Sequence, residues 1–207
     1  MTADAVALTR RSLHGIAELV LAGPQHRAIG RIRLRIVGGG FGTIGEPALR
    51  VEGGDLVSGT ARIALSGQTY AALAEAAGIE AGAPEGLYPD GSGVKPDEVI
   101  TVDPEAGAEI LRAFAAGDEA LRGFAPETEP VLWPEHFDLA ITLDEVNYGV
   151  SPGDDHLPEP YAYVGPHRPR EGKFWNAPFG AARTLRVLGN ADAIQGFFEE
   201  GKRRTDS

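Results

Sequence analysis

Short β-like segments follow one another between residues 29 and 65, with turns instead of helices between them. From Ile29 to Val37, apolar side chains alternate strictly with basic ones, which places Arg31, Arg33 and Arg35 on one face of a strand. Glycine turns separate three further β segments, at 49–51, 56–58 and 61–65. Strands clustered in this way, without regular βαβ alternation, predict an α+β protein with a mainly antiparallel sheet flanked by helices.

Helices are predicted on both sides of these strands. An N-terminal helix should end near Gly23-Pro24, because its apolar residues recur at spacings of three and four: Leu13, Ile16, Ala17 and Val20. A second helix should run from 69 to 77, up to Gly78. Asp103-Pro104 is a helix start signal, and a separate short helix is predicted from Asp118 to Phe124. Asn190 should cap the last helix, whose face carries Ile194, Phe197 and Phe198.

We predict a single domain over residues 1–207, since a chain of this length is ordinary for one large domain. Residues 79–97 are rich in glycine and proline and should form a long irregular loop, which is either a lid or a linker. The C-terminal tail from Lys202 to Ser207 is expected to fray. The sequence makes no prediction of the oligomeric state.

Charge and composition exclude several classes of protein. A net charge of -11 argues against nucleic-acid binding, because phosphate contacts need a concentrated positive surface. No apolar run is long enough to span a membrane, and Met1 to Arg11 lacks the order of a signal peptide, so we expect a cytoplasmic protein without membrane association. Cysteine is absent, so a bound metal would need His, Asp or Glu ligands.

Two basic or glycine-rich features of the first 50 residues have simple structural interpretations. The run from Gly40 to Gly45 matches G-x-G-x-x-G, but Glu46-Pro47 leads into another β segment and not into a helix, which favours a hairpin loop over a dinucleotide-binding turn. The row Arg31, Arg33 and Arg35 could hold an anion, although pairing with acids of a neighbouring strand is the stronger interpretation.

Unusual residues are concentrated between Trp133 and Gly180. Alternation from His136 places His136, Asp138 and Asp144 on one strand face, with an apolar opposite face of Phe137, Leu139, Ile141 and Leu143. A histidine held by an aspartate is a suitable general base, so these three residues are the catalytic candidates. A strand from Tyr161 to Gly165 should pair with this one through a connection at 148–160, bringing Tyr163 near Asp144.

The same segment contains the candidate ligand-binding and metal-binding residues. Aromatic and amide side chains could form a pocket, with Trp133, Tyr148, Tyr161, Tyr163 and Trp175 as walls and Asn147 and Asn176 as orienting groups. A divalent metal could be bound by His136 and Asp138 together with His156 or His167. No calcium or zinc loop spacing occurs, and the alternative is a hydrogen-bonded structural histidine.

Four stretches of this segment resemble an uncharacterised family of actinobacterial proteins of unknown function. These are Trp-Pro-Glu-His-Phe-Asp from Trp133, Asn-Tyr-Gly-x-Ser-Pro-Gly-Asp from Asn147, Pro-Tyr-x-Tyr-Val-Gly-Pro from Pro160 and Phe-Trp-Asn-Ala-Pro-Phe-Gly from Phe174. The resemblance spans most of the chain and implies no activity, cofactor or catalytic residue.

Three functions are therefore compatible with the sequence. Small-molecule binding in a pocket built from residues 133–180 is the leading hypothesis. A metal-dependent, hydrolase-like enzyme using His136 and Asp138 is the second, and a non-catalytic protein-interaction module with exposed aromatic residues is the third. A serine hydrolase is disfavoured because no G-x-S-x-G motif occurs.

Overall fold

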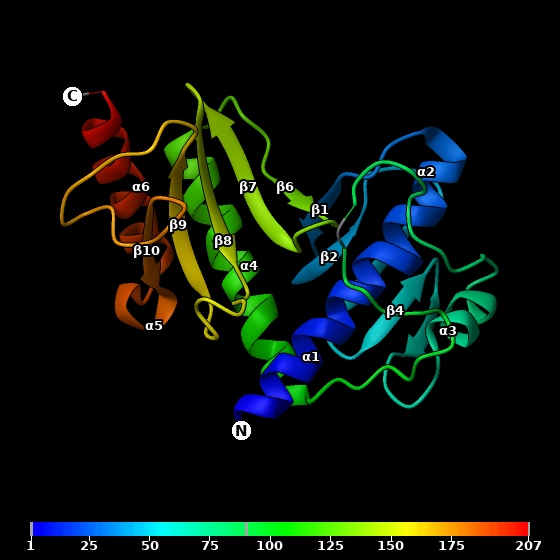
Figure 1. Ribbon diagram of the computed structural model, residues 1–207. Helices are drawn as coiled ribbons and strands as arrows, with labels where there is room; N and C mark the ends of the chain where they lie inside the picture. Colours follow the sequence, from blue (N-terminus) through cyan, green and yellow to red (C-terminus); the bar gives the residue numbers. More distant parts are fainter. Residues whose placement is uncertain (1, 90, 207) are drawn as a thin grey trace. The chain divides into compact units, whose positions relative to one another are not determined.

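The computed structural model describes residues 2–89 and 91–206 and has the predicted α+β architecture (Figure 1). All paired strands are antiparallel. The chain forms two compact units: unit 1 comprises Met1–Leu111 and Leu132–Phe137, and unit 2 comprises Arg112–Val131 and Asp138–Ser207. Whether these units belong to a single domain stays a prediction, and each unit is described by itself below.

Unit 1 begins with one long helical segment that does not end at Gly23-Pro24. Helix α1 (Ala3–Gly15) continues as the π-helix η1 (Ile16–Ala22) and then as α2 (Gly23–Ile29). The amide of Gly23 donates to Glu18 O, five residues back. Pro24 has no N–H for the next carbonyl, and Leu19 O instead accepts a hydrogen bond of 2.9 Å from Gly82 N. The predicted helix end was wrong because a distant loop supplies the missing donor.

The strands of unit 1 are ordered β6-β1-β2-β3-β4-β5. Their bounds are β1 (Leu34–Val37), β2 (Gly40–Thr43), β3 (Leu49–Glu52), β4 (Asp55–Ser58), β5 (Ala61–Ala64) and β6 (Val131–Trp133). Strand β1 starts later than predicted, because α2 runs to Ile29 and Gly30 ends it in a left-handed conformation. Gly38 and Gly39 form the turn between β1 and β2, and Gly40–Thr43 is strand β2 itself, so the prediction of a hairpin loop at Gly40–Gly45 was wrong.

The core of unit 1 lies between η1, the strands and helix α3 (Tyr70–Ala76). Thr69 caps α3 by accepting the amide of Ala72, and this helix was correctly predicted. All residues of η1 are buried, among them Ile16, Ala17 and Val20 of the predicted apolar face, and Leu13 of α1 is buried as well. The described residues of 79–97 form no helix or strand.

In unit 2, four strands are ordered β7-β8-β9-β10. Their bounds are β7 (Asp138–Leu143), β8 (Val146–Ser151), β9 (Tyr161–Pro166) and β10 (Ala181–Thr184). The predicted direct pairing of β7 with β9 was wrong, because β8 lies between them and pairs with both. Asp144 and Glu145 form the β7–β8 turn with positive φ angles of 51° and 62°.

Helices cover one face of the unit 2 strands (Figure 1). Helix α4 (Pro104–Phe124) is continuous, so the separate helix predicted from Asp118 does not exist, while the predicted cap at Asp103 is confirmed. Short α5 (Leu185–Leu188) precedes α6 (Ala191–Thr205), which Asn190 caps as predicted and which includes much of the segment expected to fray. Within the described part of the chain, no helix has the length and apolar character needed to cross a membrane.

The covered face is apolar, as the alternation of β7 predicted. Leu139 and Ile141 are buried in β7, and Tyr148 in β8 packs on Phe124 and Phe198 at ring distances of 4.7 and 6.0 Å. Helices approach closely where they carry glycine: a Cβ on Gly117 would lie 2.8 Å from the Val150 side chain, and one on Gly201 would lie 2.7 Å from Val164. The opposite face of these strands is therefore the one available for polar side chains.

Candidate functional sites

Two tyrosine–aspartate pairs occupy that opposite face of unit 2. Tyr161 and Tyr163 project from β9 on the same side because they are two residues apart. The Tyr163 hydroxyl donates a hydrogen bond to Asp138, and the Tyr161 hydroxyl donates one to Asp154. We call these four residues, together with Phe179, the Tyr–Asp face.

Gly149 allows Tyr163 to reach Asp138 across an intervening strand. Tyr163 is paired with Gly149 of β8, which is paired in turn with Ala140 of β7. A Cβ on Gly149 would lie 2.6 Å from both Cζ and the hydroxyl oxygen of Tyr163. The tyrosine ring therefore lies over the strand where no side chain stands, and its hydroxyl reaches Asp138, two residues from Ala140.

Asp154 is held by an additional set of hydrogen bonds. Its second carboxylate oxygen accepts the amides of His156 and Leu157, each at 2.7 Å. Burial alone would raise the pKa of Asp154, but the hydrogen bonds from Tyr161 and these amides outweigh it and lower the pKa. The pKa of Tyr161 is raised, first by burial and then by its bond to Asp154. Asp154 is thus held as an anion beside a neutral tyrosine.

Phe179 completes the Tyr–Asp face. Its ring centroid lies 6.0 Å from that of Tyr161 and 6.2 Å from that of Tyr163, and the two tyrosine rings are 6.3 Å apart. Phe179 is 37% exposed, whereas Tyr161 is buried. His156 contacts the Phe179 ring edge-on at 5.8 Å. The arrangement is an aromatic surface that is open at Phe179 and has two carboxylates hydrogen-bonded to its tyrosines.

The predicted catalytic residues each have a different environment. His136 is 70% exposed in unit 1, and its Nε2 lies 3.7 Å from Glu135. Asp138 begins β7, whereas Asp144 lies beyond its far end, about 20 Å away along the strand. Asp144 pairs with Lys202 at 3.0 Å. Asp138 and Asp144 therefore cannot serve one catalytic centre, which corrects the prediction that they share a site.

The aromatic residues predicted to form the pocket walls also lie in different environments. Tyr148 is a core residue on the helix-covered face, so it is not a wall residue beside Tyr163. Trp133 lies in unit 1 with the Arg33 guanidinium 5.6 Å from its ring. Trp175 packs edge-on against Phe174 at 4.8 Å, and Phe174 lies beside Arg204, whose guanidinium is 4.9 Å from its ring. Of the predicted aromatic walls, the Tyr–Asp face contains Tyr161 and Tyr163.

Both predicted orienting amides make internal hydrogen bonds. Asn176 donates to Ala182 O at 3.1 Å and accepts Ala182 N–H at 2.9 Å, which fastens its loop to β10. Asn147 accepts the Thr142 hydroxyl at 2.8 Å across the β7–β8 hairpin. These bonds give both residues a structural role, and their ligand-binding role stays a prediction.

The metal hypothesis gains no support from the structure. Among residues 2–89 and 91–206, no three His, Asp or Glu side chains are grouped so that they could hold a metal ion. Of the predicted ligands, His136 belongs to unit 1, whereas Asp138 and His156 belong to unit 2. His156 is exposed and His167 has Nε2 3.4 Å from Asn147.

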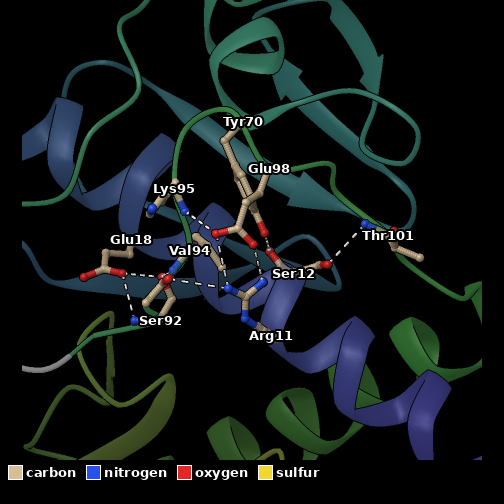
Figure 2. Close-up of polar contacts among 10 residues, drawn as sticks. Arg11, Ser12, Glu18, Tyr70, Ser92, Val94, Lys95, Glu98 and Thr101 are labelled. Atoms are coloured by element: carbon tan, nitrogen blue, oxygen red, sulfur yellow. Dashed lines mark hydrogen bonds and ion pairs between the residues drawn. The ribbon is translucent and has the colours of Figure 1, made fainter.

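Unit 1 contains a polar cluster that the sequence interpretation missed. Glu18 is a buried acid within the otherwise apolar run of η1, and one of its oxygens accepts both the amide and the hydroxyl of Ser92, at 2.9 and 2.5 Å (Figure 2). On α1, Arg11 pairs with Glu98 at 2.7 Å, and Ser12 accepts the amide of Thr101 at 3.1 Å. A single acid inside seven consecutive helical residues was the signal available in the sequence.

His14, one helical turn before Glu18, has a packed and neutral environment. Its Nε2 lies 2.7 Å from Pro134 O, and its ring stacks on Phe137 at 5.5 Å. Burial lowers the pKa of His14, against the opposing effects of the Pro134 carbonyl and the Glu18 charge. The Trp-Pro-Glu-His-Phe stretch thus packs onto α1 through Pro134 and Phe137, while His136 points to solvent.

Comparison with known proteins found no match: no protein-family model, curated protein or solved structure is significantly similar to this chain.

Proposed function

We propose that unit 2 binds a small molecule on the Tyr–Asp face, and that the bound part of this molecule is an organic cation such as an amine. The observation that carries the proposal is an exposed aromatic ring, Phe179, packed on two tyrosines whose hydroxyls donate to carboxylates. A cation is attracted to the face of an aromatic ring. Hydrogen bonding to a carboxylate makes a phenol more electron-rich and places negative charge beside it, which strengthens that attraction.

The charge of the protein favours the same class of ligand. A chain with a net charge of -11 attracts cations and repels anions. A single exposed cation–π contact is worth about 0.5–1 kcal/mol, so a minimal probe should bind weakly, in the millimolar range or above. A natural ligand would gain affinity from additional contacts along the 152–160 and 172–180 loops.

Tetramethylammonium chloride is a suitable probe, followed by ¹H–¹⁵N and aromatic NMR shifts of the whole chain. We expect saturable shifts at Phe179, Tyr163 and His156, with sodium chloride as the ionic-strength control and neopentyl alcohol as a neutral, water-soluble analogue of similar size. Phe179→Ala should abolish the shifts, whereas Val187→Ala, at a residue 68% exposed on α5, should preserve them. Equal shifts with neopentyl alcohol, or shifts that do not depend on Phe179, would rule out the proposal.

A further inference from the structure

Strand β1 and the residues just before it carry a row of three arginines. Arg31, Arg33 and Arg35 are all exposed. Between them, Ile32 is partly buried and Leu34 is 1% exposed, so the arginines lie on the face of the chain opposite the core. Alternate residues of an extended chain are about 7 Å apart, which is therefore the spacing of successive arginines. We call these three residues the arginine row.

A buried glutamine holds the backbone of the arginine row. Gln25 of α2 is fully buried, and its side-chain amide donates to Arg31 O and to Arg33 O, each at 2.9 Å. Its Oε1 accepts the amides of Ile44 and Gly45, at 2.7 and 3.1 Å. Carbonyl groups two residues apart point to the same side in an extended chain, so these bonds hold the start of the row extended before β1 begins.

The arginine row has no acidic partner in the described part of the chain. The strands that pair with β1 are β2, Gly-Phe-Gly-Thr, and β6, Val-Leu-Trp, and neither contains an acid. Among residues 2–89 and 91–206, no guanidinium of the row forms an ion pair or a hydrogen bond with another residue. On β3, by contrast, Arg50 pairs with Glu52 at 3.1 Å. The predicted pairing of the row with acids of a neighbouring strand was therefore wrong.

The middle arginine is positioned by an aromatic ring. The Arg33 guanidinium lies 5.6 Å from the centre of the Trp133 ring, a cation–π contact that limits the conformations of a long side chain. A guanidinium carries its N–H donors in a planar fork that matches the two oxygens of a carboxylate. The row thus presents three such forks at intervals of about 7 Å.

We propose that the arginine row binds an extended acidic segment of a partner protein, with acidic residues at every second position. Side chains at alternate positions of an extended peptide are also about 7 Å apart, so three carboxylates match the three guanidiniums in register. Arginine clusters commonly recognise acidic motifs in this way. The surface belongs to unit 1, and the inference does not depend on ligand binding at the Tyr–Asp face.

The net charge of the chain favours a short acidic segment over a long polyanion. A nucleic acid would be repelled along its whole length by a chain with a net charge of -11. At physiological salt, exposed charges more than about 8 Å apart are largely screened from one another. For a segment no longer than the row, the contacts with the three guanidiniums therefore outweigh the repulsion by distant acids.

Two peptides of identical composition test the inference. Acetyl-Glu-Thr-Glu-Thr-Glu-amide has alternating acids, and acetyl-Glu-Glu-Glu-Thr-Thr-amide has consecutive acids. Each is titrated into the full chain and followed by NMR of backbone amides, arginine Nε–H groups and the Trp133 indole N–H. We expect saturable shifts at residues 31–36 and at Trp133, with about threefold tighter binding or more for the alternating peptide, and weaker binding as sodium chloride is added.

Variants of exposed arginines supply the matched comparison. Arg35→Gln should weaken binding of the alternating peptide about threefold, and Arg31→Gln/Arg35→Gln about tenfold, since both leave the Arg33 contact with Trp133 in place. Arg112→Gln removes the same charge from α4, where Arg112 is exposed and forms no ion pair in the described part of the chain. It should leave the affinity unchanged.

Three outcomes would overturn the proposal. Equal affinity for the two peptides would reduce the effect to general charge attraction without a register. Unchanged affinity in Arg31→Gln/Arg35→Gln, or an equal loss in Arg112→Gln, would place binding elsewhere on the chain. Tighter binding of a short single-stranded oligothymidylate, with shifts at the same residues, would identify the row as a nucleic-acid surface and not a peptide surface.

Discussion

Gly149→Ala tests the geometry of the Tyr–Asp face. The new methyl group would lie 2.6 Å from Cζ and the hydroxyl oxygen of Tyr163 and 2.6 Å from Leu139 O. Carbon atoms in contact are about 3.5–4.0 Å apart, so the tyrosine ring must move by roughly 1 Å. That movement breaks its hydrogen bond to Asp138, which is worth about 1.5–3 kcal/mol as a bond to a charged group. Overpacking adds about 1–3 kcal/mol, so unit 2 should lose roughly 2.5–6 kcal/mol of unfolding free energy.

Urea unfolding can report on unit 2 alone. The chain has two tryptophans, so Trp133→Phe leaves Trp175 of unit 2 as the only tryptophan fluorophore. Gly165→Ala in the neighbouring strand is the matched control, because its Cβ would lie 3.4 Å from Phe179 O, an ordinary contact. We expect that control to change stability by about 0.5 kcal/mol or less.

Tyr163→Phe separates the two contributions to the loss. It removes the hydroxyl and leaves the aromatic ring over Gly149, so it should cost the hydrogen-bond part alone. In the double variant Gly149→Ala/Tyr163→Phe, the hydroxyl bond is already absent. The losses of unfolding free energy measured for the two single variants should therefore sum to more than the loss measured for the double variant. Equal losses for Gly149→Ala and Gly165→Ala, or full additivity with Tyr163→Phe, would refute the role assigned to Gly149.

Three further predictions concern pH. The pKa of Asp154 is lower in the folded protein than the value of about 3.9 expected in the unfolded chain, so ionised Asp154 stabilises the fold above that pH and the stabilisation is lost as pH falls. The loss of unfolding free energy caused by Asp154→Asn, measured by urea unfolding, should therefore be largest at pH 7 and should shrink below about pH 4. The pKa of each of the five tyrosines is raised, and burial is the largest cause. Absorbance at 295 nm should therefore show little phenolate at pH 10, and the unfolding free energy should fall as pH rises above 10. The lowered pKa of His14 favours the folded state above about pH 6.5, so thermal unfolding of His14→Gln should depend less on pH between about 7 and 5 than that of the unmodified chain.

Local signals in the sequence were sufficient for much of the fold. The caps at Thr69, Asp103 and Asn190 act within three residues of the helices they start, so each could be identified from its immediate neighbours. The glycine turns between β3, β4 and β5 are equally local. These elements were placed correctly because short-range hydrogen bonds and turn geometry define them.

Long-range contacts account for the main errors in unit 1. Gly23-Pro24 has the composition of a helix end, since glycine is flexible and proline lacks an amide hydrogen. Here glycine admits the Gly82 carbonyl, and the Gly82 amide satisfies the carbonyl that proline leaves unpaired. The partner is about sixty residues away in sequence, so no local pattern distinguishes this docking point from a helix end. The buried role of Glu18 depends on the same loop.

Strand β8 shows how one missed element displaces a candidate site. Val146, Tyr148 and Val150 alternate with Asn147, Gly149 and Ser151, which is a strand pattern, but polar and small residues made the segment resemble a connection. With β8 omitted, Tyr163 was expected near Asp144 at one end of β7. With β8 in place, Tyr163 lies opposite Gly149 and reaches Asp138 at the other end. A glycine inside a strand indicates a close approach by another group, and at Gly149 that group is the tyrosine of the site.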